Sequence, residues 1–398
     1  MTLKNYIFKN LWLQVVISLL LGLAVGLVLG EDVGIGVDDD TLSSLSSYLK
    51  IPANIFLSLI MMIIVPLIFA SIVVAITNLG AKEKMRTLGL GIGVYFVITT
   101  TISILVAVLL ASIIAPGSIL DLTSLQEAHD ISEEDLKVTE GFDLEDIPNA
   151  VSNIIPRNPI SSYLEGQMFS ILIMAVIVGL AMAALPKEST KPLLDLLESV
   201  QKITLHILII SMKIVPFAVF GLIIGMVATV GIGTMVGLGV YMVTVVLGLG
   251  IMLLVYALIL KFVAKRSISA TFSKFRNPQT LAFSTASSMA TMPVTLKTAE
   301  EDLKVDPKVS KFVIPLGTTV NMDGTALYQV IAVFFLAQLF AIELSMISIL
   351  VIIITSLLAS IGTPAVPGAG VIVLSTILIT VGIPPVGILL LLSVDRIL

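Results

Sequence analysis

One carboxylate stands in a long apolar stretch where a charge is costly. Between residues 312 and 342 the only charged side chain is Asp323, in the run NMDGT that starts at Asn321. A charged side chain at membrane depth costs about 3 kcal/mol on insertion scales, so a partner must neutralise it. Asn321, Thr319 and Thr325 add oxygen atoms and no sulfur or imidazole, which favours a hard metal cation as that partner.

The composition identifies an integral membrane protein. Of the 398 residues, 57% are hydrophobic and 12% are charged, whereas a soluble domain carries about 25% charged residues. The chain has no Cys, and its two histidines, His129 and His206, lie far apart. These counts exclude disulfides and thiolate metal sites and argue against an imidazole cluster. The first apolar run is too long for a cleavable signal peptide.

Six apolar runs of spanning length precede residue 264. They cover residues 11–30, 51–79, 88–115, 163–185, 203–230 and 233–263. If the runs alternate across a membrane, the basic clusters between them all fall on one side, together with the N-terminus. The positive-inside rule makes that side cytoplasmic, so we expect a multi-pass protein of the inner (plasma) membrane. The opposite side carries an acidic loop at residues 121–146.

Two interrupted segments follow these runs. Residues 271–295 have a Ser/Thr-rich centre, and the charged stretches at both ends indicate that the segment enters and leaves by the cytoplasmic face. Residues 344–381 are interrupted by GTPAVPGAG at 362–370 and are expected to do the same from outside. Non-helical backbone at membrane depth is tolerated only beside protein or a water-filled cavity. Two opposed hairpins around an unwound polar stretch are typical of an inverted-repeat secondary transporter.

Three motifs resemble the glutamate transporter family, the dicarboxylate/amino acid:cation symporters, in its prokaryotic type. They are NMDGT at 321–325, TASSMATMP at 285–293 and GTPAVPGAG at 362–370, and the likeness extends through nearly the whole chain. The resemblance implies an all-α integral membrane fold with eight transmembrane helices, two opposed re-entrant hairpins and inverted repeats, in a homotrimer. By the same resemblance, residues 393–398 match the start of the family's last helix, so the last helix would be cut short at Leu398, before the family's remaining substrate and sodium ligands. A longer protein or a truncated form would explain this, and we favour the longer protein.

The resemblance also implies a fixed scaffold and a transport domain that moves like an elevator. The scaffold is expected at residues 1–81 (spans 1 and 2) and 119–230 (the acidic loop and spans 4 and 5). The transport domain is expected at residues 82–118 (span 3) and 231–398. That second part would hold span 6, hairpin 1 near 270–296, span 7 near 309–342, hairpin 2 near 345–382 and the start of span 8.

By the same resemblance the cation is sodium, bound at three sites. The first site matches Thr99, Thr100, Asn321, Asp323 and the carbonyl of Phe96, and the second matches Gly317 and Asn321. The third matches Thr319, Met322, Ser360, Ile361 and Thr363, mostly through carbonyls. A thioether is a poor sodium ligand, so Met322 is better interpreted as a packing contact. From the residues alone, Thr99 to Thr101 could equally bond their own helix carbonyls.

The positions that match the family's substrate site lie in the three motifs. They are Ala286, Ser287, Ser288, Thr325, Val366, Ala369 and Gly370. Some members carry an arginine where Ala286 stands, and others place it in the last helix, so an acidic substrate remains possible. Gln329 stands where potassium-countertransporting members have a glutamate. Because an amide cannot carry that proton, we predict sodium coupling without potassium exchange.

We therefore expect a sodium-coupled symporter of an amino acid, aspartate or glutamate first among them, working by elevator-type alternating access. An enzyme is not expected, because no nucleophile–base pair or catalytic metal cluster is present. The alternatives are a proton-coupled symporter of dicarboxylates or neutral amino acids and, from another functional class, a channel-like anion conductance. The expected partners are the small-molecule substrate, the lipid bilayer and two further copies of the chain, with no nucleic acid.

Overall fold

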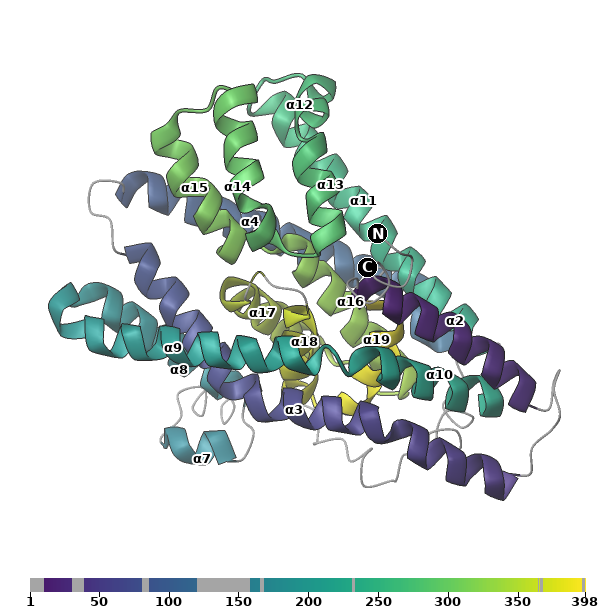
Figure 1. The fold of residues 1–398 in the computed structure, drawn as a ribbon. Coiled ribbons are helices and arrows are strands. Elements are labelled where there is room, and N and C mark those ends of the chain that lie inside the picture. Colours follow the sequence, from purple (N-terminus) through teal and green to yellow (C-terminus); the bar gives the residue numbers. More distant parts are fainter. Residues whose placement is uncertain are drawn as a thin grey trace, which may run out of the picture.

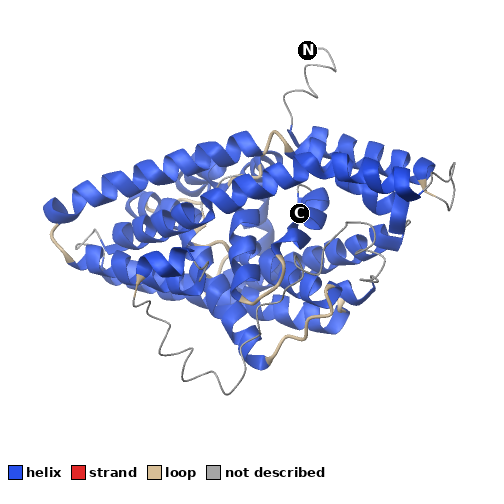
Figure 2. Ribbon diagram, turned by 90° about the horizontal axis from the view of Figure 1, so that it is seen from below, coloured by secondary structure: helices blue, strands red, loops and turns tan. Residues whose placement is uncertain are grey.

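The described part of the computed structural model of this protein is built from helices and contains no strand (Figure 2). The structure describes residues 11–30, 39–80, 86–119, 158–164, 168–230, 233–363, 365, 368–395 and 398. The all-α prediction is confirmed. The predicted acidic loop and one predicted substrate contact, Val366, lie outside the described residues.

One group of helices is centred on α3. Its members are α2 (Leu11–Leu29), α3 (Asp39–Gly80), α7 (Pro159–Leu164), α8 (Met168–Ala184), α9 (Lys187–Ser211) and α10 (Val215–Val230). Helix α3 packs against α8, α9 and α10, and α2 lies along α10. The crossing of α3 and α10 is close, because a side chain on Gly221 would collide with the carbonyl oxygen of Leu49. Glycine permits this approach of two backbones.

A second group surrounds α16. It contains α4 (Arg86–Ile114), η2 (Pro116–Ile119), α11 (Gly233–Phe262), α12 (Ile268–Lys274), α13 (Arg276–Thr285), α14 (Ser288–Lys297), η4 (Thr298–Asp302), α15 (Pro307–Val320), α16 (Asp323–Leu339), α17 (Met346–Gly362), α18 (Ala369–Thr380), η5 (Pro385–Gly387) and α19 (Ile388–Asp395). Helices α4, α11, α17 and α18 all contact α16. Every residue from Ala326 to Ala337 is buried. A helix that is apolar on all sides and covered on all sides forms the core of this group.

Four helical stretches of the described chain are long and apolar enough to cross a membrane. They cover Ser44–Thr77, Gly91–Ile119, Val236–Phe262 and Pro307–Leu339. A fifth span is possible if α9 and α10, which meet at a 49° bend, are counted together. Large apolar side chains are exposed on these helices, among them Leu109 of α4 and Leu254 of α11. Such faces suit contact with lipid, and the predicted total of eight spans stays a prediction.

The helix bounds depart from the apolar runs in two places. The run at 203–230 is divided between α9 and α10 by a break at Met212–Ile214, and α9 begins well before the run, at Lys187. Helix α3 begins at Asp39, not at residue 51. In both cases a polar segment continues the helix beyond the apolar part. Hydrophobicity marks the lipid-crossing stretch, whereas helix propensity and packing decide where the helix ends.

The two predicted hairpins each form a pair of helices joined by a short tip. Helices α13 and α14 meet at Ala286, whose φ of 48° is in the left-handed region, and at Ser287. Helices α17 and α18 are joined by residues 363–368. In Figure 1 the group α12 to α15 projects at the top, while α17 and α18 lie centrally. That either pair re-enters a membrane stays a prediction.

Candidate functional site

The long apolar segment that holds Asp323 is broken at this residue. Helix α15 ends at Val320, and Asn321 and Met322 leave helical geometry, with ψ values of 82° and 57°. The amide of Asn321 still donates to the carbonyl of Gly317 at 3.0 Å. Helix α16 then begins at Asp323, so the carboxylate stands at a helix N-terminus, where the macrodipole favours negative charge. The unwound polar stretch predicted from the sequence is therefore present.

Helix α4 supplies three hydroxyl groups to this break. Thr99 donates to Oδ1 of Asn321 at 3.1 Å, and Thr100 donates to Oδ1 of Asp323 at 2.6 Å. Ser103 donates to the backbone carbonyl of Asp323 at 2.7 Å. Residues three and four apart share a helix face, which explains why these hydroxyls act together. Thr101 lies off this face and bonds the carbonyl of Val97 in its own helix.

Asp323 is buried, with 5% of its surface exposed. Within the described part of the chain no basic side chain pairs with it, and no three His, Cys, Asp or Glu residues gather as a metal cluster. Its other carboxylate oxygen, Oδ2, accepts from the phenol of Tyr256 on α11 and lies 3.5 Å from the amide nitrogen of Asn321. One negative charge among neutral oxygen ligands is a donor set that suits a single hard, monovalent cation.

The other predicted sodium ligands are distributed between α15, α4 and α17. The Phe96 carbonyl accepts from Thr99 at 3.2 Å, and the Phe96 ring faces Gly317. The hydroxyl of Thr319 donates to the carbonyl of Leu316 at 3.1 Å within its own helix, and its oxygen keeps lone pairs for a cation. That carbonyls make up most of this site stays a prediction.

The two predicted hydroxyl positions at the end of α17 have different surroundings. The Thr363 hydroxyl donates to Ala359 at 2.7 Å, whereas the buried hydroxyl of Ser360 has no hydrogen-bond partner among the described residues. Helices α15 and α17 pack against each other. No described hydrogen bond joins the residues of the third set to one another: Thr319, Met322, Ser360, Ile361 and Thr363. The structure therefore shows that the helices carrying them are in contact, but no direct bond between the predicted ligands.

The tips of the two hairpins meet directly. The hydroxyl of Ser287 donates to the carbonyl of Ala365 at 2.8 Å, and the amide of Met289 points to the same oxygen at 3.3 Å. Ser287 also caps α14 by accepting from the amide of Ala290 at 3.2 Å. Among the predicted substrate positions, Ala286 and Ser288 are exposed beside this contact. The hydroxyl of Ser287 is itself engaged in the contact, through its hydrogen bond to Ala365.

Helix α16 also reaches the start of α18. The buried amide of Gln329 donates to the carbonyl of Gly370 at 3.1 Å. The methyl group of Thr325 lies beside Gly370, 3.7 Å from where a side chain would begin there. Ala369 is buried in the same place. Thr325 and Gly370 are therefore neighbours, as their assignment to one substrate site requires.

Two residues that bond Asp323 were not among the predicted site residues. Ser103 could have been found, because it lies three and four residues after the two threonines and shares their helix face. Tyr256 gives no such signal, since it stands alone among apolar residues of α11, far from Asp323 in the sequence. Only the packing of α11 on α16 brings its phenol to the carboxylate.

Comparison with known proteins identifies the family that the three motifs resemble, and the match includes all residues of the site. The profile described as "Sodium:dicarboxylate symporter family" matches residues 11–398. The "Proton/sodium-glutamate symport protein" of Bacillus subtilis is 32% identical over 355 residues, which cover 89% of this chain and 82% of that protein. The "Proton/glutamate-aspartate symporter" of Escherichia coli is 30% identical over 403 residues, which cover 100% of this chain and 89% of that protein.

A "C4-dicarboxylate transport protein" of Rhodospirillum rubrum is 30% identical over 360 residues, covering 88% of this chain and 78% of that protein. These relatives are transport proteins. Their class agrees with the broken helix that buries one carboxylate. The chain is therefore a transport protein and not an enzyme. It belongs to the sodium:dicarboxylate symporter family.

Proposed function

We propose that this protein is a sodium-coupled symporter of an acidic amino acid or a C4-dicarboxylate. The observation that carries the proposal is the buried carboxylate of Asp323 at the break between α15 and α16. The Thr100 hydroxyl donates to it, the amide nitrogen of Asn321 lies 3.5 Å from it, and no basic side chain pairs with it among the described residues. A sodium ion there would be held by the side chains of Thr99, Thr100, Asn321 and Asp323, with the Phe96 carbonyl.

Coupling follows from how short the break is. Asp323 takes part in the cation site, while Thr325, two residues later, faces Gly370 and the substrate positions. A cation that fixes the backbone at Asn321 therefore also fixes Thr325, so cation and substrate favour the same arrangement. Linkage requires the substrate to raise cation affinity by the same factor. The second and third sodium sites would add carbonyls of Gly317, Thr319, Ser360, Ile361 and Thr363.

The substrate would bind where the hairpin tips meet. Ser288 and the exposed backbone at Ala286 face this region from the first hairpin, and Ala369 and Gly370 begin α18 on the other side. The contact between Ser287 and Ala365 must open for a substrate to enter or leave. Its hydrogen bonds would then be available to the polar groups of the substrate.

The elevator mechanism and the trimer belong to the same proposal. The proposed scaffold is the group around α3, and the proposed transport domain is the group around α16. What supports this division is that packing within each group is more extensive than packing between them.

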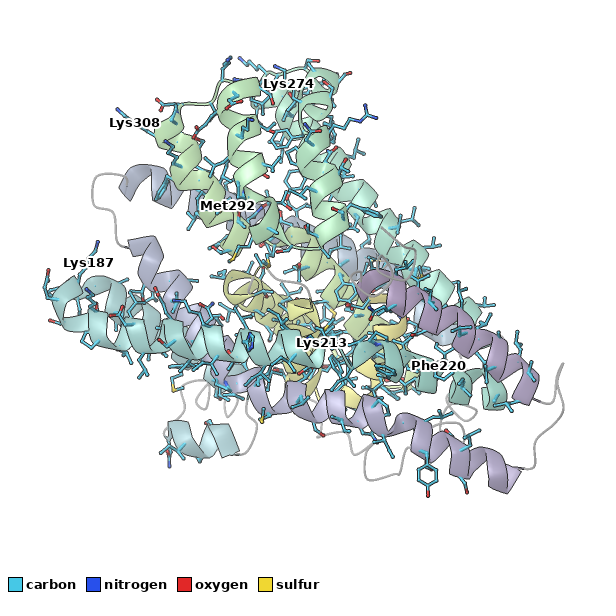
Figure 3. All side chains as sticks on the ribbon, in the orientation of Figure 1. Lys187, Lys213, Phe220, Lys274, Met292 and Lys308 are labelled. Atoms are coloured by element: carbon cyan, nitrogen blue, oxygen red, sulfur yellow. The ribbon has the colours of Figure 1, made fainter. Side chains whose placement is uncertain are left out.

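Gln329, an amide in place of an ionisable group, leads us to propose transport without potassium exchange. The proposed location is the plasma membrane with a cytoplasmic N-terminus. In Figure 3 the labelled Lys274 and Lys308 both lie towards the outer end of the projecting group of helices.

Uptake by purified protein in liposomes tests the proposal. We expect saturable accumulation of aspartate, glutamate or a dicarboxylate driven uphill by an inward sodium gradient, with no requirement for internal potassium. Accumulation driven by a pH gradient with no sodium present would replace sodium by protons as the coupling ion. Solute flux that neither saturates nor runs uphill would instead indicate a channel.

Two substitutions on the site sharpen the test. Asp323→Asn removes the only formal charge among the described residues of the proposed cation site, and we expect sodium-dependent uptake to fall about 100-fold. Thr100→Val removes one oxygen ligand, and the half-saturating sodium concentration should rise about tenfold. The matched control is Thr101→Val, because the neighbouring hydroxyl bonds its own helix and should leave the sodium dependence unchanged. Equal effects at positions 100 and 101 would contradict the assignment.

A further inference from the structure

Tyr256 is the donor to Asp323 that the cation-site assignment leaves without a role. It comes from α11, whereas the other side-chain donors come from α4 and from the break itself. Its phenol donates to Oδ2 of Asp323, and Thr100 donates to Oδ1. Each carboxylate oxygen thus receives one hydroxyl proton, and the backbone carbonyl receives a third from Ser103.

The carboxylate needs such donors when no cation is bound. A buried charge without partners costs several kcal/mol. Within the described residues, neutral groups alone compensate Asp323. A symporter must pass through a state with its cation released, so this compensation makes that state possible.

A phenol differs from the threonine hydroxyls in how it meets a cation. A threonine oxygen can keep its proton on the carboxylate and turn a lone pair towards an ion. A phenol is the more acidic donor, and its proton stays near the plane of the ring, pointed at Oδ2. A cation that draws on the charge of Asp323 weakens this oxygen as an acceptor. The Tyr256 bond is therefore strongest when the cation is absent.

We propose that Tyr256 is a positioning residue. Its phenol donates a hydrogen bond to the Asp323 carboxylate in the cation-free carrier, and this bond breaks when the cation binds. The proposal rests on the cation-site assignment made above. In consequence, Tyr256 lowers the affinity for the cation and stabilises the empty carrier on its return across the membrane. Removing the phenol should raise cation affinity and slow only the steps that involve the empty carrier.

Tyr256→Phe tests this with two measurements on the full-length protein. Thermal stability in detergent is titrated with sodium chloride against choline chloride at constant ionic strength, without substrate. We expect the half-saturating sodium concentration to fall about tenfold, since hydrogen bonds to charged groups are among the stronger ones. In liposomes, net uptake should slow about tenfold while substrate exchange, with sodium on both sides, stays within twofold of the unmodified protein.

Tyr48→Phe is the matched control. Tyr48 lies on α3, in the other group of helices, is 74% exposed, and no described hydrogen bond joins its phenol to Asp323 or to the predicted cation ligands. It should leave both measurements unchanged. The proposal is overturned if Tyr256→Phe leaves sodium affinity unchanged or weakens it, or if it slows exchange and net uptake equally. If sodium stabilises neither the variant nor the unmodified protein, the cation site itself is refuted, which is a different result.

Discussion

The two helical hairpins have the same local design and opposite surroundings. Each consists of two helices joined at a short tip, and the tips touch. The α13–α14 hairpin is mostly exposed, with Phe283 84% and Met289 46% accessible. In the α17–α18 hairpin, by contrast, every residue from Val371 to Leu378 is buried, and both of its helices contact α3 and α8.

The two hairpins therefore share their local form but differ in the helices that pack against them. The group around α3 lies against one hairpin and leaves the other free (Figure 1). Separating α17 and α18 from α3 would expose a continuous apolar surface, at about 25 cal/mol for each Å² of it brought into contact with water. Moving α13 and α14 exposes little that is not exposed already. In this conformation, moving the α17–α18 hairpin away from α3 therefore costs more free energy than moving the α13–α14 hairpin.

The largest expected effect is on chemical accessibility. The chain has no native cysteine, so single Ser→Cys variants report on one position each. Ser284 of α13 is exposed and Ser375 of α18 is fully buried, and each hydroxyl bonds a carbonyl of its own helix at 3.0 Å. We expect a water-soluble maleimide to label Ser284→Cys on the order of a thousand times faster than Ser375→Cys, because the buried site reacts only after local opening. Similar rates would remove the contrast between the hairpins.

A smaller effect is expected on stability. Leu374→Ala deletes a fully buried side chain of α18 and should lower the free energy of unfolding by about 3 kcal/mol. Phe283→Ala removes a larger but exposed side chain of α13 and should change it by less than about 0.5 kcal/mol. Denaturant unfolding in a mild detergent measures both. A large loss for the phenylalanine variant would show that α13 is covered in the folded protein.

The smallest effect concerns the contact between the two tips. Ser287→Ala removes both the bond to Ala365 and the cap of α14, and we expect a loss of about 1 kcal/mol. Ser284→Ala is the matched control and should cost nothing measurable in the same unfolding experiment. If the two alanine variants are equally stable, the tip contact contributes nothing to the difference between the hairpins.

Sequence reasoning reached the helices and the break between them because both depend on local properties. Apolar length marked α2, α4 and α11 to within two residues of their ends, and the one charge in residues 312–342 marked the unwound stretch. Thr99 and Thr100 were expected beside Asn321 and Asp323 through the resemblance, and their hydrogen bonds now join the same residues. These features are set by residues whose types are unusual for their surroundings.

What could not be predicted depends on packing between distant segments. The phenol of Tyr256 reaches Asp323 only because α11 lies on α16, and no periodicity in either helix contains that information. The unequal cover of the hairpins is likewise a property of the assembled fold.

The length of α3 has a consequence for the membrane around the protein. Its apolar part, residues 51–79, has 29 residues, which corresponds to about 44 Å of straight helix. A hydrocarbon core about 30 Å thick would require a tilt on the order of 50°. Pro66 offers an alternative, because a proline inside a helix lets it bend. Bilayer thickness should therefore act on α3 directly, and lipids with shorter or longer acyl chains would shift the balance between its tilted and bent forms.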